Sequence, residues 1–181
     1  MSVDHTLIGR DNLSGQLART FTETAMGHGG LLLLAGEAGV GKTRVAIDAL
    51  TRSELLVLRV TIGPATASAF GPIIAALRAF LRAVPNGLSV DDYLGQYLPL
   101  LLPELGRAPP DVDRTTLFET VLNTFRSVAV REPTVVFLDD IHDADHATLE
   151  LLPYLAAALG ELPLLVLGAY RSDELRRDHL Q

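Results

Sequence analysis

The residues best suited to do chemistry lie in one short segment of the chain. Positions 36–43 read GEAGVGKT and fit the pattern G-x-x-x-x-G-K-[ST]. Glycines in such a pattern let the backbone turn tightly, so that successive N–H groups face one anion. We predict that ATP and Mg²⁺ bind here, through the loop and the arginine after it: Gly36, Glu37, Ala38, Gly39, Val40, Gly41, Lys42, Thr43 and Arg44. The alternative is a glycine-rich turn that joins a strand to a helix and binds no ligand.

Two side chains of this segment have distinct expected roles. Lys42 is the only lysine among the 15 basic residues of the chain. Its ammonium is a compact charge that can reach the β- and γ-phosphates inside a ring of amides, where the wider guanidinium of an arginine is not equivalent. The hydroxyl of Thr43 is the group that we expect to bind Mg²⁺. The preference for arginine elsewhere is best explained as a compositional bias.

A second candidate lies at positions 135–140, which read VVFLDD. Four apolar residues followed by an acid are typical of a buried strand that ends at a magnesium site. Asp139 would then hold Mg²⁺ opposite Thr43, and Asp140 could polarise an attacking water molecule. The alternative for Asp140 is an acid that caps a helix or turn.

Arg171 follows the last apolar run of the chain. If that run is a parallel strand, its carboxyl end points at the same crevice as the phosphate loop, and Arg171 could contact the γ-phosphate. The alternative is a solvated arginine or one that pairs with Asp173. His142 and His146 have a spacing that could suit a metal ion, but we interpret them as part of a polar loop that enters a helix.

These residues need a scaffold, and the apolar pattern predicts one. Continuous apolar runs at 31–35, 55–62, 134–139 and 164–170 are typical of strands buried on both faces. Apolar stripes with helical spacing follow them, after residue 43 and over 70–84, 117–128 and 151–159. The alternation predicts an α/β fold, in which a parallel sheet is flanked by helices.

Three local features modify this scheme. Residues 85–113 are rich in proline and glycine, and we expect an insertion with short helical pieces near 90–102. Asp145 is a candidate N-cap of the last helix. Pro153 should kink that helix or shift its start, because proline removes a backbone donor.

Composition excludes several classes of protein. Fifteen basic and 22 acidic residues give a net charge of −7, which argues against nucleic-acid binding by this segment itself. The chain contains no cysteine, so disulfides and thiolate sites are excluded. Its apolar runs are far shorter than the roughly 20 residues of a transmembrane helix, and its first residues do not resemble an export signal. We expect a cytoplasmic protein without membrane contact.

Four segments together resemble a known family. Leu7 to Arg10, residues 36–44, residues 135–152 and residues 167–175 resemble the AAA-type P-loop ATPase domain of STAND-class regulators, in particular the N-terminal domain of large LuxR-type transcription regulators. The resemblance implies a RecA/ASCE-like sheet in which one strand separates the strands that precede Lys42 and end at Asp139. It also implies that Gly9 and Arg10 lie near the adenine and that Arg171 senses the nucleotide.

The same resemblance implies a regulatory role. Such domains are slow ATPases in which ATP and ADP hold different assembly states, within multidomain proteins that bind DNA through a C-terminal domain. Self-association is therefore a possible property, and ATP and ADP are the expected ligands. We interpret residues 1–181 as the N-terminal part of such a domain, with the fifth strand, the lid and the downstream domains absent, and we expect strand 31–35 to lie exposed at a sheet edge.

This sequence departs from the family in the loop after Asp140. Asp143 stands where tryptophan is usual, and His146 stands where proline is usual, so the packing of this loop should differ. Asp140 is shorter by a methylene than the glutamate of vigorous ATPases, and we expect slow hydrolysis. Alternatives to a nucleotide switch are a vigorous ATPase, a phosphotransferase module attached to another output domain, and an interaction scaffold with a degenerate site.

Overall fold

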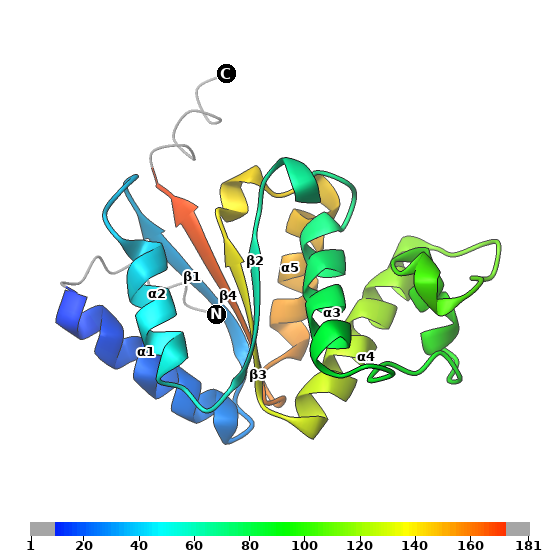
Figure 1. Cartoon of the computed structure of the whole chain (residues 1–181), viewed down its shortest axis with the longest axis horizontal. Coiled ribbons are helices and arrows are strands. Elements are labelled where there is room, and N and C mark those ends of the chain that lie inside the picture. Colours follow the sequence, from blue (N-terminus) through cyan, green and yellow to red (C-terminus); the bar gives the residue numbers. More distant parts are fainter. Residues whose placement is uncertain (1–9, 173–181) are drawn as a thin grey trace.

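The strands form one parallel sheet, as predicted. The computed structural model describes residues 10–172, and Figure 1 shows its elements. Its four strands are arranged in the order β1-β4-β3-β2, and all pairings are parallel. The strands are β1 (Gly30–Gly36), β2 (Leu56–Thr61), β3 (Thr134–Asp139) and β4 (Leu164–Arg171). As the family resemblance implied, one strand, β4, separates β1 from β3.

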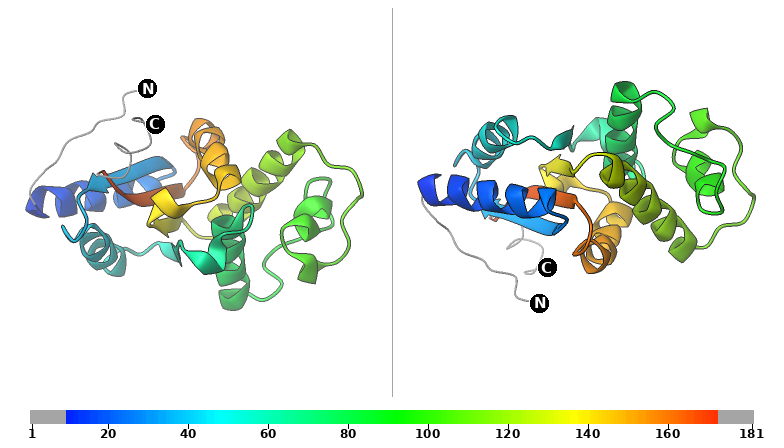
Figure 2. Two further views of the ribbon diagram at one scale, coloured as in Figure 1. Left: turned by 90° about the horizontal axis from the view of Figure 1, so that it is seen from above. Right: turned by 90° about the horizontal axis from the view of Figure 1, so that it is seen from below.

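Helices cover both faces of the sheet (Figures 1 and 2). One face is covered by α1 (Arg10–Ala25) and α2 (Lys42–Thr51), and the other by α3 (Gly71–Ala83), α4 (Arg114–Arg131) and α5 (His146–Ala158). Alternate residues of β3 divide between the two cores: Val135 and Phe137 face α1 and α2, whereas Val136 and Leu138 face the other helices. This explains why the strand reads as one continuous apolar run.

The helix α1 was not predicted from the sequence. Leu17, Phe21 and Thr24 form its buried stripe, at a spacing of four and then three residues. Its other positions are mostly polar, so the helix is polar on average. The three-residue stripe was the one available signal, and it is short.

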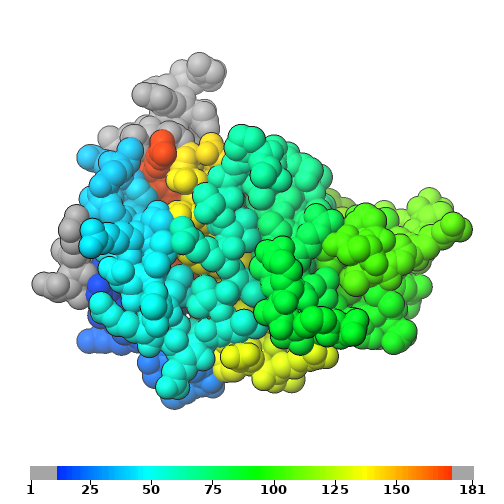
Figure 3. Space-filling view, in the orientation of Figure 1, coloured from blue at the N-terminus to red at the C-terminus, as the bar shows by residue number. Residues whose placement is uncertain are grey.

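The insertion contains short helical turns, as expected, but no α-helix. Its two 3₁₀ turns span Gly95–Leu100 and Pro103–Leu105. Leu98 and Leu102 bury the segment against the core, while Tyr93 stays exposed. In Figures 1 and 3 this green segment forms the end of the molecule away from α1.

Helix α5 tolerates its proline. Asp145 caps the helix by accepting a hydrogen bond from the Thr148 N–H (3.0 Å), which confirms the predicted N-cap. The helix begins at His146 and continues through Pro153, so the expected shift of its start does not occur. Pro153 lies on the exposed side, where water can bond the carbonyl that lacks its helical donor.

Strand β1 forms an edge of the sheet. Within residues 10–172 it pairs on one side only, with β4. Leu33 of this strand is 38% exposed. The predicted apolar edge is therefore present.

Candidate active site

The loop between β1 and α2 has the backbone geometry of an anion cradle. Gly39 (φ 75°) and Gly41 (φ 93°) both adopt left-handed conformations that residues with a side chain rarely adopt. Lys42 follows directly as the first residue of α2. The loop thus ends at a helix N-terminus, where backbone N–H groups and the helix dipole favour a negative charge.

The Lys42 side chain folds back over this loop. Its Nζ donates to the carbonyl oxygens of Gly36 and Glu37, both at 2.8 Å. A Cβ at Gly36 would lie 3.3 Å from the Lys42 Cδ, so glycine leaves room for the lysine stem. The ammonium is therefore held beside the loop in which we expect the phosphates to bind, and its present partners are neutral carbonyls.

The two predicted magnesium ligands meet, although 96 residues separate them in sequence. The hydroxyl of Thr43 donates to Oδ1 of Asp139 at 2.8 Å. Asp139 is the last residue of β3 and only 4% exposed. A hydroxyl and a carboxylate oxygen are hard donors of the kind that Mg²⁺ prefers, so this pair fits the ion. The other carboxylate oxygen, Oδ2, lies 3.7 Å from Nη2 of Arg59 on β2.

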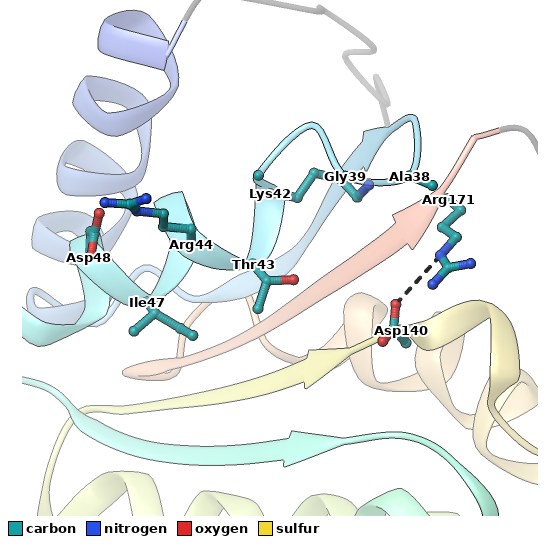
Figure 4. Close-up of a pocket in the computed structure, with 10 residues that line it drawn as sticks. Ala38, Gly39, Lys42, Thr43, Arg44, Ile47, Asp48, Asp140 and Arg171 are labelled. Carbon is teal, nitrogen blue, oxygen red and sulfur yellow. Dashed lines mark ion pairs between the residues drawn. The ribbon is translucent and has the colours of Figure 1, made fainter.

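Asp140 lies beside this pair in a left-handed conformation. Its dihedral angles (φ 60°, ψ 49°) are uncommon for a residue with a side chain, although aspartate adopts them more readily than most residues. It precedes the 3₁₀ turn Ile141–Asp143 but makes no capping hydrogen bond there, so the structure does not support the capping alternative. Its Oδ1 lies 3.9 Å from Nε of Arg171, which points across from the end of β4 (Figure 4).

A cavity of about 490 Å³ lies against Lys42, Thr43, Asp140 and Arg171, whereas Asp139 and Arg59 are not part of its lining. Figure 4 shows it between the phosphate loop and the ends of β3 and β4. The predicted residues in its lining are Ala38, Gly39, Gly41, Lys42, Thr43, Arg44, Asp140 and Arg171. Gly36, Glu37 and Val40 belong to the loop but do not line the cavity.

Sequence reasoning missed three residues of this region. Ile47 and Asp48 extend the lining along α2, on the face that also carries Arg44 (Figure 4). The three-to-four-residue helical spacing from Arg44 could have identified them. Arg59 had no comparable signal, because its proximity to Asp139 depends on strand pairing.

The remaining predicted residues either lie outside the described part of the chain or do not line the cavity. Gly9 and Asp173 lie outside the described residues, and Arg10 is described only as the first residue of α1. His142 is nearly buried, with Nε2 3.7 Å from Asp143, whereas His146 is exposed and lies 3.1 Å from Glu150. Within residues 10–172, no group of three or more His, Cys, Asp and Glu side chains could hold a metal ion. No helix in this range is long and apolar enough to cross a membrane.

One relative resembles most of the chain. An uncharacterized protein of Rhizobium meliloti (strain 1021) is 25% identical over 191 residues, which cover 91% of this chain. The chain spans only 18% of that protein's length.

The family assignment rests on a match to the sequence profile of a domain family. The profile of the AAA ATPase domain matches residues 6–167, which include the phosphate loop, the end of β3 and the first half of β4 but not Arg171. The matched region is most of the chain and contains three strands of the parallel sheet and part of the fourth. The chain therefore belongs to the AAA ATPase domain family.

Proposed function

We propose that this domain binds ATP together with Mg²⁺, hydrolyses it slowly, and serves as a nucleotide switch in a larger regulatory protein. The observation that carries the proposal is the hydrogen bond between Thr43 and Asp139, directly beside the phosphate loop. It joins the two expected magnesium ligands at the N-terminus of α2, where a polyphosphate is favoured.

The loop and its lysine would bind the phosphates. Backbone N–H groups around Gly39 and Gly41 face the anion, and Lys42 exchanges its two carbonyl partners for phosphate oxygens. A charge-assisted bond to phosphate is stronger than a bond to a neutral carbonyl, which favours this exchange. Arg44, Ile47 and Asp48 line the part of the cavity along α2, where the nucleoside has room.

The magnesium site would consist of Thr43 and Asp139, the latter through a coordinated water. When bound, Mg²⁺ neutralises the charge that develops on the β- and γ-phosphates. Thr43 and Asp139 already lie within hydrogen-bond distance, so little rearrangement is needed to present both oxygens to the ion.

Asp140 and Arg171 would act on the γ-phosphate. Asp140 orients a water molecule, whose oxygen attacks the γ-phosphorus while the bond to the β–γ bridging oxygen breaks, and the water proton leaves to Asp140 or solvent. Arg171 lies beside it and can compensate charge on the transferred group. The short reach of an aspartate supports slow turnover.

We further propose that the larger protein regulates transcription. This role is supported by the resemblance to the STAND-class and LuxR-type regulators. The relative of which the chain matches 18% supports only the presence of this domain within a larger protein. The net charge of −7 argues against DNA binding by this segment, so we expect any DNA contact to come from another domain. A cytoplasmic location and nucleotide-dependent self-association stay predictions.

The test is a thermal-shift titration of the chain with Mg-ATP and Mg-ADP. At 100 times its dissociation constant, a ligand adds about 2.7 kcal/mol to the free energy of unfolding. We expect this shift in the wild type and its loss in Lys42→Ala, with Arg82→Ala on the exposed side of α3 as the matched control. An equal shift in Lys42→Ala would reject binding by this loop.

The rate of phosphate release from ATP distinguishes a nucleotide switch from a vigorous ATPase. A turnover far below about 1 per second supports the switch, and a turnover well above it favours a vigorous ATPase. Transfer of the γ-phosphate to an added acceptor would instead favour a phosphotransferase.

A further inference from the structure

The side chain of Arg59 lies against the magnesium site. Strand β2 pairs with β3 in a register that places Thr61 beside Asp139 and Arg59 two residues earlier. Since successive side chains of a strand alternate between faces, Arg59 and Thr61 point to the same face of the sheet. A long side chain reaches its diagonal neighbour on the next strand, and Nη2 of Arg59 lies 3.7 Å from Oδ2 of Asp139.

Both oxygens of the Asp139 carboxylate therefore have a partner. Oδ1 accepts the hydrogen bond of Thr43, and Oδ2 faces the guanidinium of Arg59. The Asp139 side chain is 6% exposed, and a carboxylate so buried is costly without a compensating charge. The Arg59 side chain is 45% exposed, so it can leave the carboxylate for solvent without burying its own charge.

We propose that Arg59 is a positioning residue that compensates the charge of Asp139 when no divalent cation is bound and competes with that cation for the carboxylate. The inference rests on the proposed function in assigning the magnesium site to Thr43 and Asp139. It adds that Arg59, on the neighbouring strand β2, lowers the affinity of this site for the cation.

Two effects of opposite sign follow from the charge of Arg59. A guanidinium beside Asp139 repels a divalent cation that approaches the same carboxylate, so it weakens binding of the cation. Without the cation, the same guanidinium reduces the repulsion between Asp139 and the phosphates, so it strengthens binding of the free nucleotide. An ion pair that only stabilises the contact between β2 and β3 predicts neither effect.

The first experiment measures binding of Mn²⁺ alone, followed by electron paramagnetic resonance in the absence of nucleotide. We expect Arg59→Gln to bind Mn²⁺ about three- to tenfold more tightly than the wild type, given a half-exposed partner at this distance. Asp139→Asn in the same background should remove the gain. Arg59→Lys, which keeps the charge, should stay near the wild type.

The second experiment measures the dissociation constant of a fluorescent ATP analogue with EDTA and with increasing Mg²⁺. In Arg59→Gln, we expect the dissociation constant in EDTA to rise and the half-saturating Mg²⁺ concentration to fall, each about three- to tenfold. Arg82→Gln removes the same charge from the exposed side of α3 and should change neither. Arg59→Met gives the same readings if Arg59→Gln does not fold.

The outcomes separate this inference from the proposed function. Equal Mn²⁺ affinities of the wild type and Arg59→Gln, or equal behaviour of Arg59→Gln and Arg82→Gln, overturn the role of Arg59. A wild type that binds no nucleotide with or without Mg²⁺ overturns the proposed function, while the Mn²⁺ measurement still decides the role of Arg59.

Discussion

Asp145 connects the start of α5 to the start of α3 through hydrogen bonds of its side chain. Its removal tests how much these bonds stabilise the fold. Its Oδ1 accepts hydrogen bonds from the N–H groups of Thr148 and Phe70, both at 3.0 Å. Its Oδ2 accepts the hydroxyl of Thr148 at 2.5 Å. The bonds to Thr148 cap α5, and the bond to Phe70 holds the residue that precedes α3 in a left-handed conformation (φ 58°).

The expected cost of Asp145→Ala follows from these bonds. Loss of an N-cap costs about 1 kcal/mol. The N–H of Phe70 would also lose its partner in a partly buried position, which costs about 1–2 kcal/mol more. We expect the free energy of unfolding to fall by about 2–3 kcal/mol, and the melting temperature by about 4–12 °C in a domain of this size.

Urea denaturation followed by circular dichroism measures this loss, and the chain offers a matched control. Asp113 caps α4 in the same way, through the N–H (2.9 Å) and hydroxyl (3.0 Å) of Thr116. Both of these bonds lie within the first turn of its own helix, whereas Asp145 also accepts a bond from Phe70 beside another helix. Asp113→Ala should therefore lose about half as much stability as Asp145→Ala, or less. Equal losses in the two variants would refute the argument that the bond to Phe70 stabilises the fold.

Three further predictions concern the ion pair of the insertion, the sheet edge and hydrolysis. The Arg78 guanidinium bonds both carboxylate oxygens of Glu104 and lowers its pKa to about 2. A carboxyl with a lowered folded-state pKa contributes stability above its unfolded pKa, so this contribution, about 1 kcal/mol or less for an exposed pair, should fade as the pH falls from about 4.5 to 2. Denaturation at pH 5 and pH 3 should show a smaller pH dependence in Arg78→Gln, and an unchanged dependence would contradict the assignment. Leu33→Lys places a charge on the exposed edge of β1 and should reduce light scattering of the concentrated chain at constant melting temperature; equal scattering would show that this edge does not mediate association. Asp140→Ala should lower phosphate release at least about tenfold while the thermal shift with Mg-ATP persists, and unchanged release would exclude Asp140 from the reaction.

Much of the scaffold could be predicted from local pattern. Strands buried on both faces appear as continuous apolar runs, so the ends of β1 to β4 were located within one residue. The phosphate loop depends on residue types at fixed spacing, and glycine at positions 39 and 41 permits the left-handed conformations that the loop adopts there. Helix α1 escaped prediction because its buried stripe is short and its other positions are polar.

The sequence by itself determined which groups stand at the ends of the strands: Lys42 and Thr43 after β1, Asp139 and Asp140 at the end of β3, and Arg171 at the end of β4. Only the tertiary structure decided which of these side chains touch. The two motifs predicted that Asp139 lies opposite Thr43, but the direct hydrogen bond between them and the contact of Asp139 with Arg59 depend on strand order and register, which long-range packing sets. The bond from Phe70 to Asp145 likewise joins residues 75 positions apart. Spacing along the chain carries no direct information on such pairs, because the sheet brings them together only after the intervening helices have packed on its faces.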